Sequence, residues 1–505
     1  MVLLLILLSS IFVVFLFYRT TRTTPHLPPG PPGLPLIGNL HQLPNSAPHR
    51  YLWRLSKQYG PLIFLRFGLK PTIVVSSAKL ARQVMKTHDL VFASRPPLLS
   101  QQKLSYNGID VTFAPYSDYW REVKKLFALH LFSTRRIHSF RPIREDEVLR
   151  TIRRLSQSAA SHKVINLSET IMSFSVTLIC KVAFGKGYEL EDNKKGSERS
   201  RFHGLLNETQ ALWTEFCFTD YVPWLGWIDR IRGLHSRLDK TFKQLDMFYQ
   251  QVIDDHMNPK NPQTDKRDVI DVFLQIMNDH STSVDLTMDH IKALLMDIFV
   301  AGTDTSAATL VWAMTSLMKN PRVMKKVQGE IRKLYGEKEF ISEEDIERLP
   351  YLRAVLKETL RLFPPAPLLA PRESMEKCNI EGYEIQAKTL VLVNAWAIAR
   401  DPETWEDPEQ FYPERFFDCS IDFKGRDFEL IPFGAGRRIC PGIQMGVITV
   451  ELMLANLVHC FNWEFPDGIE EQDIDTEVIP GITMHKKNDL CLLARNHIAL
   501  PLQEH

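Results

Sequence analysis

Along most of the chain, apolar residues recur every three or four positions, which is the spacing of a helix with one buried face. The longest such stretch, TMDHIKALLMDIFVAGTDTSAATLVWAMTSLMK, covers residues 287–319. Thr287 can cap its first turn, Asp289 complements the helix dipole there, and Asn320 and Pro321 end it. This length exceeds that of a usual globular helix, so we expect the helix to cross the whole domain.

Strand-like stretches are few and short. We predict strands at residues 72–76 and 389–393 and in the residues that lead to Leu430. The sequence therefore predicts a mainly α fold with a small β component.

The chain opens on residues 2–18, which carry no charge, and Arg19 and Arg22 follow. At 1.5 Å per residue this run reaches about 26 Å, which suits the thin bilayer of the endoplasmic reticulum. The positive flank on its C-terminal side would keep the rest of the chain in the cytosol, so the sequons at Asn166 and Asn207 would stay unmodified. A cleaved secretory signal fits less well, because no basic residue precedes the run and no small-x-small cleavage pattern follows it.

We therefore predict a single-pass anchor at residues 1–19. The proline-rich stretch LPPGPPGLPLIGNL lies in residues 20–40, which we predict to be a stiff hinge before a body at 41–505. A ligand for a proline-binding domain is the competing interpretation of the prolines. Length alone favours about three domains of ~150 residues, but the body contains no low-complexity linker that would divide it.

Composition excludes several classes of protein. The net charge is +1 at pH 7, which gives no electrostatic case for binding nucleic acid. The seven cysteines are scattered and form no CxxC pair. This argues against a disulfide framework and against structural zinc, and it favours a reducing compartment.

One cysteine has an unusual setting, the stretch PFGAGRRICPG at residues 432–442. Pro441 suits the first position of the helical stretch that follows, so we expect Cys440 at the N-cap, where the helix dipole lowers the pKa of a thiol. The three glycines of the stretch permit tight turns and a close approach of the backbone to a bound group. Its two adjacent arginines can pair with anions. An anionic sulfur in such a loop is a metal-ligand arrangement.

Three simpler interpretations compete. An isolated cysteine is most often a small buried hydrophobe, but that would not require this loop. A dinucleotide-binding GxGxxG loop needs a glycine where Ile439 stands. A cysteine nucleophile needs a histidine base; none lies nearby in the sequence, and a distant one stays open.

The stretch resembles the haem-binding motif of cytochrome P-450 enzymes, Phe-x-x-Gly-x-Arg-x-Cys-x-Gly. All its fixed positions are matched, by Phe433, Gly436, Arg438, Cys440 and Gly442. The resemblance implies that Cys440 is the axial thiolate of the iron of haem b, iron protoporphyrin IX, whose electron donation favours O–O cleavage. It also implies that Phe433 shields the sulfur and that Arg438 pairs with a haem propionate.

Backbone near Gly434 would then approach the cofactor.

In the long helix, the polar stretch AGTDTS stands among apolar residues, which costs stability unless its groups are hydrogen-bonded. Thr303 and Thr305 could bond back to carbonyls one turn earlier. The stretch also resembles the oxygen-activation motif of the same family. That implies that Gly302 opens a groove for dioxygen and that Thr305 and Asp304 supply protons, which favours true monooxygenation over peroxide rearrangement.

KETLR places Glu358 and Arg361 on one face of a helix, and PERF supplies Arg415. A solvent-exposed pair is the default interpretation of such a motif. The family instead pairs these elements in a buried network that supports the haem loop, so the resemblance implies a structural role for all three.

The resemblance also implies further propionate contacts. Arg372 closes the turn PPAPLLAPRE, which would line the substrate cavity. Trp120 and Lys124 stand where the family usually has Trp-x-x-x-Arg. Lysine departs from that pattern because it lacks the bidentate fork of arginine, and a cation on a helix surface is the alternative.

The motifs are most similar to those of the large plant-specific A-type branch. The resemblance implies one large helix-rich domain, anchored in the endoplasmic reticulum membrane and facing the cytosol. It further implies a monooxygenase that uses dioxygen and takes electrons from a separate NADPH-cytochrome P-450 reductase, with a cytochrome b-type protein as a second donor. The expected substrate is a small lipophilic plant metabolite, such as a terpenoid, alkaloid, phenylpropanoid or aldoxime. Alternatively, the net reaction is ring formation, dehydration or coupling.

The predicted cavity walls are Val111, Phe113, Phe299, Ala301, Ala366, Leu369 and Ile482.

Two other classes of protein stay open. A haem-binding sensor or carrier would keep Cys440 but would need neither Asp304 nor Thr305 in a buried helix. A membrane-tethered cysteine hydrolase would need a histidine beside Cys440 and would carry no pigment.

Overall fold

The computed structural model describes residues 26–44, 46–186, 197–258, 268–279 and 284–498, so the predicted anchor lies outside the described residues. The helices are α2 (Pro48–Tyr59), α3 (Ala78–Arg82), α4 (Leu99–Leu104), α5 (Asp118–Leu126), α6 (Thr134–Ser139), α7 (Arg141–Ala160), α8 (Leu167–Phe184), α9 (Ser197–Thr214), α10 (Phe218–Tyr221), α11 (Trp227–Ile231), α12 (Leu234–Met257), α13 (Val269–Asp279), α14 (Met288–Met296), α15 (Gly302–Met318), α16 (Pro321–Tyr335), α17 (Glu343–Ile346), α18 (Pro350–Leu362), α19 (Ala395–Ile398) and α20 (Ile443–Cys460). The strands are β1 (Leu62–Phe67), β2 (Lys70–Val75), β3 (Ile165–Asn166), β4 (Arg372–Glu373), β5 (Cys378–Ile380), β6 (Tyr383–Ile385), β7 (Leu390–Val393), β8 (Phe461–Glu464) and β9 (Cys491–Asn496). The prediction of a mainly helical fold is confirmed.

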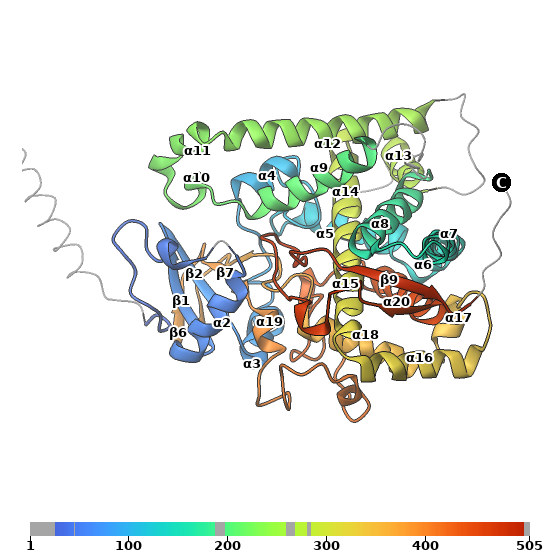
Figure 1. Cartoon of the computed structure of the whole chain (residues 1–505). Coiled ribbons are helices and arrows are strands. Elements are labelled where there is room, and N and C mark those ends of the chain that lie inside the picture. The colour runs from blue at the N-terminus through green and yellow to red at the C-terminus, as the bar shows by residue number, and fades with distance from the viewer. Residues whose placement is uncertain (1–25, 45, 187–196, 259–267, 280–283, 499–505) are drawn as a thin grey trace, which may run out of the picture.

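The predicted long helix is present, and it runs through the middle of the molecule (Figure 1). It consists of α14, a π-helical turn at Asp297–Ala301, and α15. Thr287 caps it as expected: its hydroxyl accepts from the His290 N–H, and its own N–H donates to His290 Nδ1 at 3.0 Å. The helix ends before Pro321, which begins α16.

The largest sheet has the strand order β1-β2-β7-β4, with β2 and β7 parallel and the other neighbours antiparallel. The strands predicted at 72–76 and 389–393 are therefore confirmed as β2 and β7. The strand predicted near Leu430 is wrong. Leu430 is buried in a turn in which its N–H donates to the Asp427 carbonyl at 3.2 Å, so its apolar neighbours serve the core without a strand partner.

Within the described part of the chain, three helices are long and apolar enough to cross a membrane, namely α8, α14–α15 and α20, but 72%, 83% and 72% of their most apolar windows lie buried inside the structure. They form the centre of the core, where α15 packs against both α8 and α20. Next to them, the indole of Trp312 stacks on Phe363 with ring centroids 4.4 Å apart. The helix that carries the AGTDTS stretch is thereby fixed on several sides.

The described part of the proline-rich segment lies along β1. The Phe64 N–H donates to the Pro29 carbonyl at 2.9 Å, and Arg66 exchanges two hydrogen bonds with Asn39, at 2.7 and 2.8 Å. Gly38 has φ of +59°, and a Cβ there would lie 2.0 Å from the Arg66 carbonyl oxygen. The segment from Pro29 to Asn39 is thus docked along β1.

Candidate active site

The loop that carries Cys440 is closed by the backbone. The Cys440 N–H donates to the Phe433 carbonyl at 3.0 Å. Gly434 and Gly436 have φ of +68° and +70°, a region that favours glycine. A Cβ on Gly436 would also lie 2.1 Å from the carbonyl oxygen of Met85. The glycine spacing of this stretch is therefore required by its shape.

Cys440 does not cap the following helix. α20 begins at Ile443 with Gly442 as its N-cap, so the predicted N-cap position is wrong by two residues. The predicted lowering of the thiol pKa is wrong too. Burial raises the pKa of Cys440, and the Gly442 N–H and the charge of Lys124 oppose that effect only in part. Because a coordinating metal deprotonates such a thiol outright, the site suits a sulfur that becomes anionic when it binds a cation.

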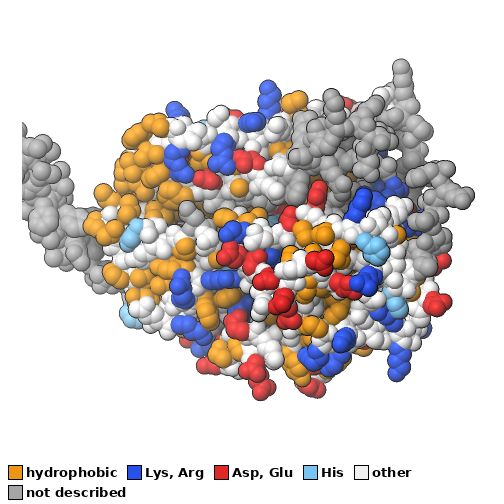
Figure 2. Space-filling view, in the orientation of Figure 1, with side chains coloured by type: hydrophobic (Ala, Val, Ile, Leu, Met, Phe, Trp, Pro, Cys, Tyr) orange, Lys and Arg blue, Asp and Glu red, His pale blue; other side chains and the backbone are white. Residues whose placement is uncertain are grey.

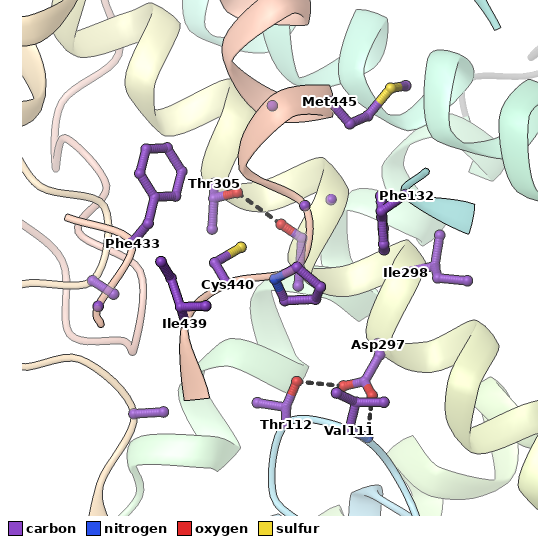
Figure 3. Close-up of a pocket in the computed structure, with 18 of the residues that line it drawn as sticks. Val111, Thr112, Phe132, Asp297, Ile298, Thr305, Phe433, Ile439, Cys440 and Met445 are labelled. Carbon is purple, nitrogen blue, oxygen red and sulfur yellow. Dashed lines mark hydrogen bonds between the residues drawn. The ribbon is translucent and has the colours of Figure 1, made fainter. Parts of the chain in front are cut away.

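Cys440 faces a cavity of about 310 Å³ (Figure 3). The predicted site residues that line it are Val111, Trp120, Lys124, Ala301, Gly302, Thr305, Ala366, Leu369, Arg372, Phe433, Gly434 and Arg438. The structure thus brings together residues from five separate stretches of the chain around one sulfur.

Three predicted wall residues do not line this cavity. Phe113 turns away and packs on Trp213, with ring centroids 5.2 Å apart. Phe299 is fully buried in an aromatic cluster with Phe248, 5.5 Å away. Ile482 packs on the main core. The prediction that these three residues line the cavity is therefore wrong, because their side chains pack in the core.

Four cations gather at one end of the cavity: Arg95, Lys124, Arg372 and Arg438. Burial lowers their pKa values, to about 10 at Arg372, and together with neighbouring positive charge to about 9 at Arg438 and about 8 at Lys124. The nearest carboxylate to Arg372 is that of Asp89, 3.9 Å away. A group with two carboxylates would relieve this repulsion, so the residues present fit the haem that the sequence predicts, with its propionates at this end.

The predicted Trp120 is oriented by the backbone. Its indole N–H donates to the Val111 carbonyl at 2.9 Å, and the Arg438 guanidinium lies 4.0 Å from the ring centroid. Lys124 donates to the Arg437 carbonyl, in the cysteine loop itself. Trp120 therefore holds Arg438 in place, and Lys124 ties α5 to the loop.

On the long helix, Thr305 and Gly302 face the cavity. The Thr305 hydroxyl donates to the Ala301 carbonyl at 2.8 Å, the back-bonding that the sequence left open, whereas Thr303 Oγ1 is buried without a partner in the described part of the chain. A Cβ on Gly302 would lie 3.0 Å from Ile179 Cδ1. The close approach of α8 is therefore one reason for this glycine, beside the predicted dioxygen groove.

Asp304 is fully buried and is absent from the cavity wall. Its Oδ1 lies 2.8 Å from Nε2 of His485. Nothing in the sequence pattern singles out His485, because its partner is remote in the chain.

The KETLR and PERF motifs meet in a buried network. Arg361 donates to both oxygens of Glu358, at 2.7 and 2.9 Å, and Arg415 Nε lies 3.2 Å from Oε1. Arg361 also donates to the carbonyls of Ala399 and Pro408. Because none of these side chains lines the cavity, the network braces the segments around it.

Other cavity residues escaped the sequence analysis, among them Arg95, Phe132 and Asp297. Asp297 accepts from the Val111 N–H at 2.6 Å and from the Thr112 hydroxyl at 2.5 Å, as Figure 3 shows. Burial raises its pKa to about 6, although these hydrogen bonds lower it. The sequence could have pointed to Asp297, because an acidic residue inside the apolar run LLMDIFV is unusual. In the structure its hydrogen bonds join the loop at Val111 and Thr112 to the long helix.

A cysteine in a rigid loop, a helical hydroxyl facing the same cavity, and a cationic end that fits two carboxylates define the site of a haem-thiolate monooxygenase. The family model described as cytochrome P-450 matches residues 28–493. The chain belongs to this family.

Relatives that are 46–49% identical to this chain include several plant enzymes. The 6,7,8-trihydroxycoumarin synthase of Pastinaca sativa is 49% identical, with 92% of each chain covered. The strychnine-11-hydroxylase of Strychnos nux-vomica is 46% identical over 91% of this chain and 90% of that one. A zebrafish cytochrome P-450 structure with progesterone superposes with a TM-score of 0.75 at 27% identity, over 89% of this chain and 99% of that one. The chain is therefore a plant A-type cytochrome P-450 monooxygenase with a haem-thiolate cofactor, as the sequence predicted.

Proposed function

We propose that this enzyme hydroxylates a coumarin, which belongs to the phenylpropanoid class among the substrates considered above. The observation that carries the proposal is the single cavity that Cys440 and Thr305 share, whose wall is mostly apolar and includes Phe132, Ile179 and Leu369. Such a wall suits a compact, flat, lipophilic molecule. Two relatives at 49% identity carry coumarin-type names, 6,7,8-trihydroxycoumarin synthase and 5-OH-xanthotoxin synthase.

Bound haem supplies the oxygen-activating chemistry. In this proposal Cys440 holds the iron and Phe433 covers the sulfur. Arg372, Arg438 and Lys124 hold the propionates. That assignment is supported by the clustering of these cations, where burial and neighbouring positive charge lower the pKa values of Arg438 and Lys124 although nearby acidic groups oppose this.

Thr305 and Asp304 then supply protons. The Thr305 hydroxyl lies on the cavity wall and can turn from the Ala301 carbonyl to a reacting oxygen. Asp304 is the neighbouring carboxylate behind it. The apolar wall keeps bulk water away from the reacting atoms, so protons must come through these side chains.

An exposed apolar surface supports attachment to the endoplasmic reticulum membrane. Leu36, Leu69, Trp227 and Ile231 are 62%, 55%, 57% and 75% exposed. The Leu69 N–H donates to the Tyr221 carbonyl at 2.8 Å, which joins the β1–β2 turn to α10. Figure 2 shows hydrophobic side chains gathered at this end of the molecule. Such a patch fits a lipid surface.

Exposed cations support docking of an acidic electron donor near the cysteine loop. The side chains of Arg121 and Lys125 on α5 and of Arg437 in the loop are 56%, 64% and 50% exposed, and each pairs with an acidic residue beside it, Asp118, Glu122 and Asp89. They adjoin Lys124, which is bonded to the loop. An NADPH-dependent reductase or a cytochrome b-type protein with a negative surface would be attracted to this face.

The test is turnover by the full chain in membranes, with a plant reductase and NADPH. The panel contains simple coumarins, furanocoumarins, an indole alkaloid, a terpene and an aldoxime, and products are read by mass. We expect the coumarins to gain one oxygen atom most rapidly. Turnover confined to other classes would contradict the substrate proposal, and a product that has lost hydrogen or water instead would show ring formation, coupling or dehydration.

A further inference from the structure

Asp304 and His485 form a pair behind the cavity wall. His485 Nε2 lies 2.8 Å from Asp304 Oδ1, with the histidine side chain 16% exposed and the aspartate fully buried. Thr305, the next residue along α15, lines the cavity. A partly exposed imidazole is thus paired with the carboxylate of the residue that precedes the cavity-lining Thr305 along α15.

The second carboxylate oxygen of Asp304 is buried and accepts no hydrogen bond from the described residues. An unsatisfied buried carboxylate oxygen costs free energy and calls for an explanation. A group that takes up and releases a proton in each turnover needs one free acceptor position. Oδ2 provides it while Oδ1 stays bonded to the imidazole.

The loop that carries His485 does not need this pair to keep its position. The Trp312 indole donates to the Met484 carbonyl at 2.7 Å, which already joins the loop to α15. The Met484 N–H donates to the Pro365 carbonyl at 2.7 Å, and the Ile479 N–H donates to the His485 carbonyl at 3.1 Å. Because these bonds hold the backbone at Met484 and His485, the loop does not depend on the imidazole for its position.

The pKa of the His485 imidazole is set by two opposing effects. Burial alone would lower the pKa of His485 from its usual value of 6.5, but the charge and hydrogen bond of Asp304 outweigh burial and raise it. The neighbouring cations have partners of their own, since Lys486 pairs with Asp475 and Lys487 with Glu477. Among the described residues, Asp304 is the only charged group paired with His485.

We propose that His485 is the outer member of the proton supply: Nε2 passes a proton to Asp304, and the partly exposed ring recovers one from solvent. The step moves one proton and no electrons. It rests on the proposed function, in which Asp304 serves the cavity. His485 touches neither substrate nor cofactor, so it acts as a positioning residue through Asp304.

His485→Gln is the decisive variant, because the amide keeps an N–H donor for Asp304 but cannot carry a proton. The chain offers a matched control in His256, whose Nε2 lies 2.7 Å from Asp268 Oδ2 and which does not line the cavity. Product formed and peroxide released per NADPH are measured between about pH 6 and 9 with the full chain, a plant reductase and a coumarin.

For the wild type and His256→Gln we expect coupling to fall as pH rises through the pKa of His485. For His485→Gln we expect about tenfold less product per NADPH, with little pH dependence. Wild-type coupling and the wild-type pH profile in His485→Gln would overturn the proposal. If the wild type makes no product from any coumarin, the substrate proposal fails instead, and the pH profile of NADPH consumption still decides the role of His485.

Unfolding gives a readout that needs no turnover. Since the folded pKa of His485 is raised, its stabilisation is full below about pH 6.5 and is lost as pH rises through the folded pKa. The difference in unfolding free energy between the wild type and His485→Gln should shrink over that range. Asp304→Asn should remove this pH dependence, and its persistence in that variant would overturn the pairing.

Discussion

The Thr305 hydroxyl donates to the Ala301 carbonyl, 2.8 Å away, where the π-helical turn of the long helix meets α15. Both residues line the cavity that Cys440 faces. The carbonyl holds the hydroxyl at the cavity wall in the resting protein, so its position does not depend on a bound substrate.

Thr305→Ala should therefore keep haem but lose coupling. Without the hydroxyl, NADPH consumption continues while product per NADPH falls by about tenfold or more, because general acid catalysis is worth at least that much. Peroxide release and product are measured together. Thr305→Ser keeps the hydroxyl and should retain most of the coupling, so equal losses in the two variants would count against the proton role.

Local chemistry explains which elements the sequence predicted correctly. Thr287 caps the long helix with groups three residues away, and Pro321 stops it, so both ends follow from adjacent residues. The N-cap position of Cys440 was predicted wrongly, because Pro441 suits the first position of a helix. In the structure the Cys440 N–H donates to the Phe433 carbonyl, so the loop continues past Cys440 and α20 begins at Ile443. That bond depends on the shape of the whole stretch.

The wall residues were harder to predict because they depend on helix register and on remote partners. The five-residue π turn at Asp297–Ala301 shifts the side chains from the α-helical spacing, and Phe299 points into the core. Arg95 donates to the Ala370 and Pro371 carbonyls, which lie 275 and 276 positions away in the sequence. His485 pairs with Asp304, 181 positions away. No local pattern records such contacts.

Asp297→Asn should loosen the loop that carries Val111 and Thr112. The amide oxygen can still accept from the Val111 N–H and the amide N–H can donate to Thr112 Oγ1, but the stronger bonds to a charged carboxylate are lost, which costs about 1–3 kcal/mol. We expect a lower unfolding temperature and weaker coumarin binding in a spectral titration. Asp254→Asn on an exposed face of α12 is the control, and unchanged binding in Asp297→Asn would contradict the role of the carboxylate.

Glu358→Gln should destabilise the fold strongly. It leaves the fully buried Arg361 guanidinium without its carboxylate, and breaking a buried pair in this way costs roughly 3–5 kcal/mol. Denaturant unfolding measures the loss, and the ratio of haem to protein should fall with it. The exposed Glu344, paired with Arg141, is the matched control, and Glu344→Gln should behave as the wild type.

Because Glu451 is buried, we expect the free energy of unfolding to fall as the pH rises. Burial raises its pKa from 4.5 to about 7, against the opposing charge of Arg353. The folded state therefore holds a proton that the unfolded state releases, so stability falls as pH rises from about 4.5 to 7. Glu451→Gln should remove this decline, on the order of 1–3 kcal/mol, in unfolding curves at both ends of the range. A parallel decline in the variant would assign it to other groups.

The most direct test of the account is the carbon monoxide difference spectrum of the reduced protein. We predict the red-shifted Soret band of thiolate ligation in the wild type and in Cys378→Ser, whose thiol lies in the β5–β6 hairpin. We predict no such band in Cys440→Ser, with circular dichroism showing that this variant is folded. A red-shifted band that survives in folded Cys440→Ser would show that another group binds the iron and would contradict the central claim.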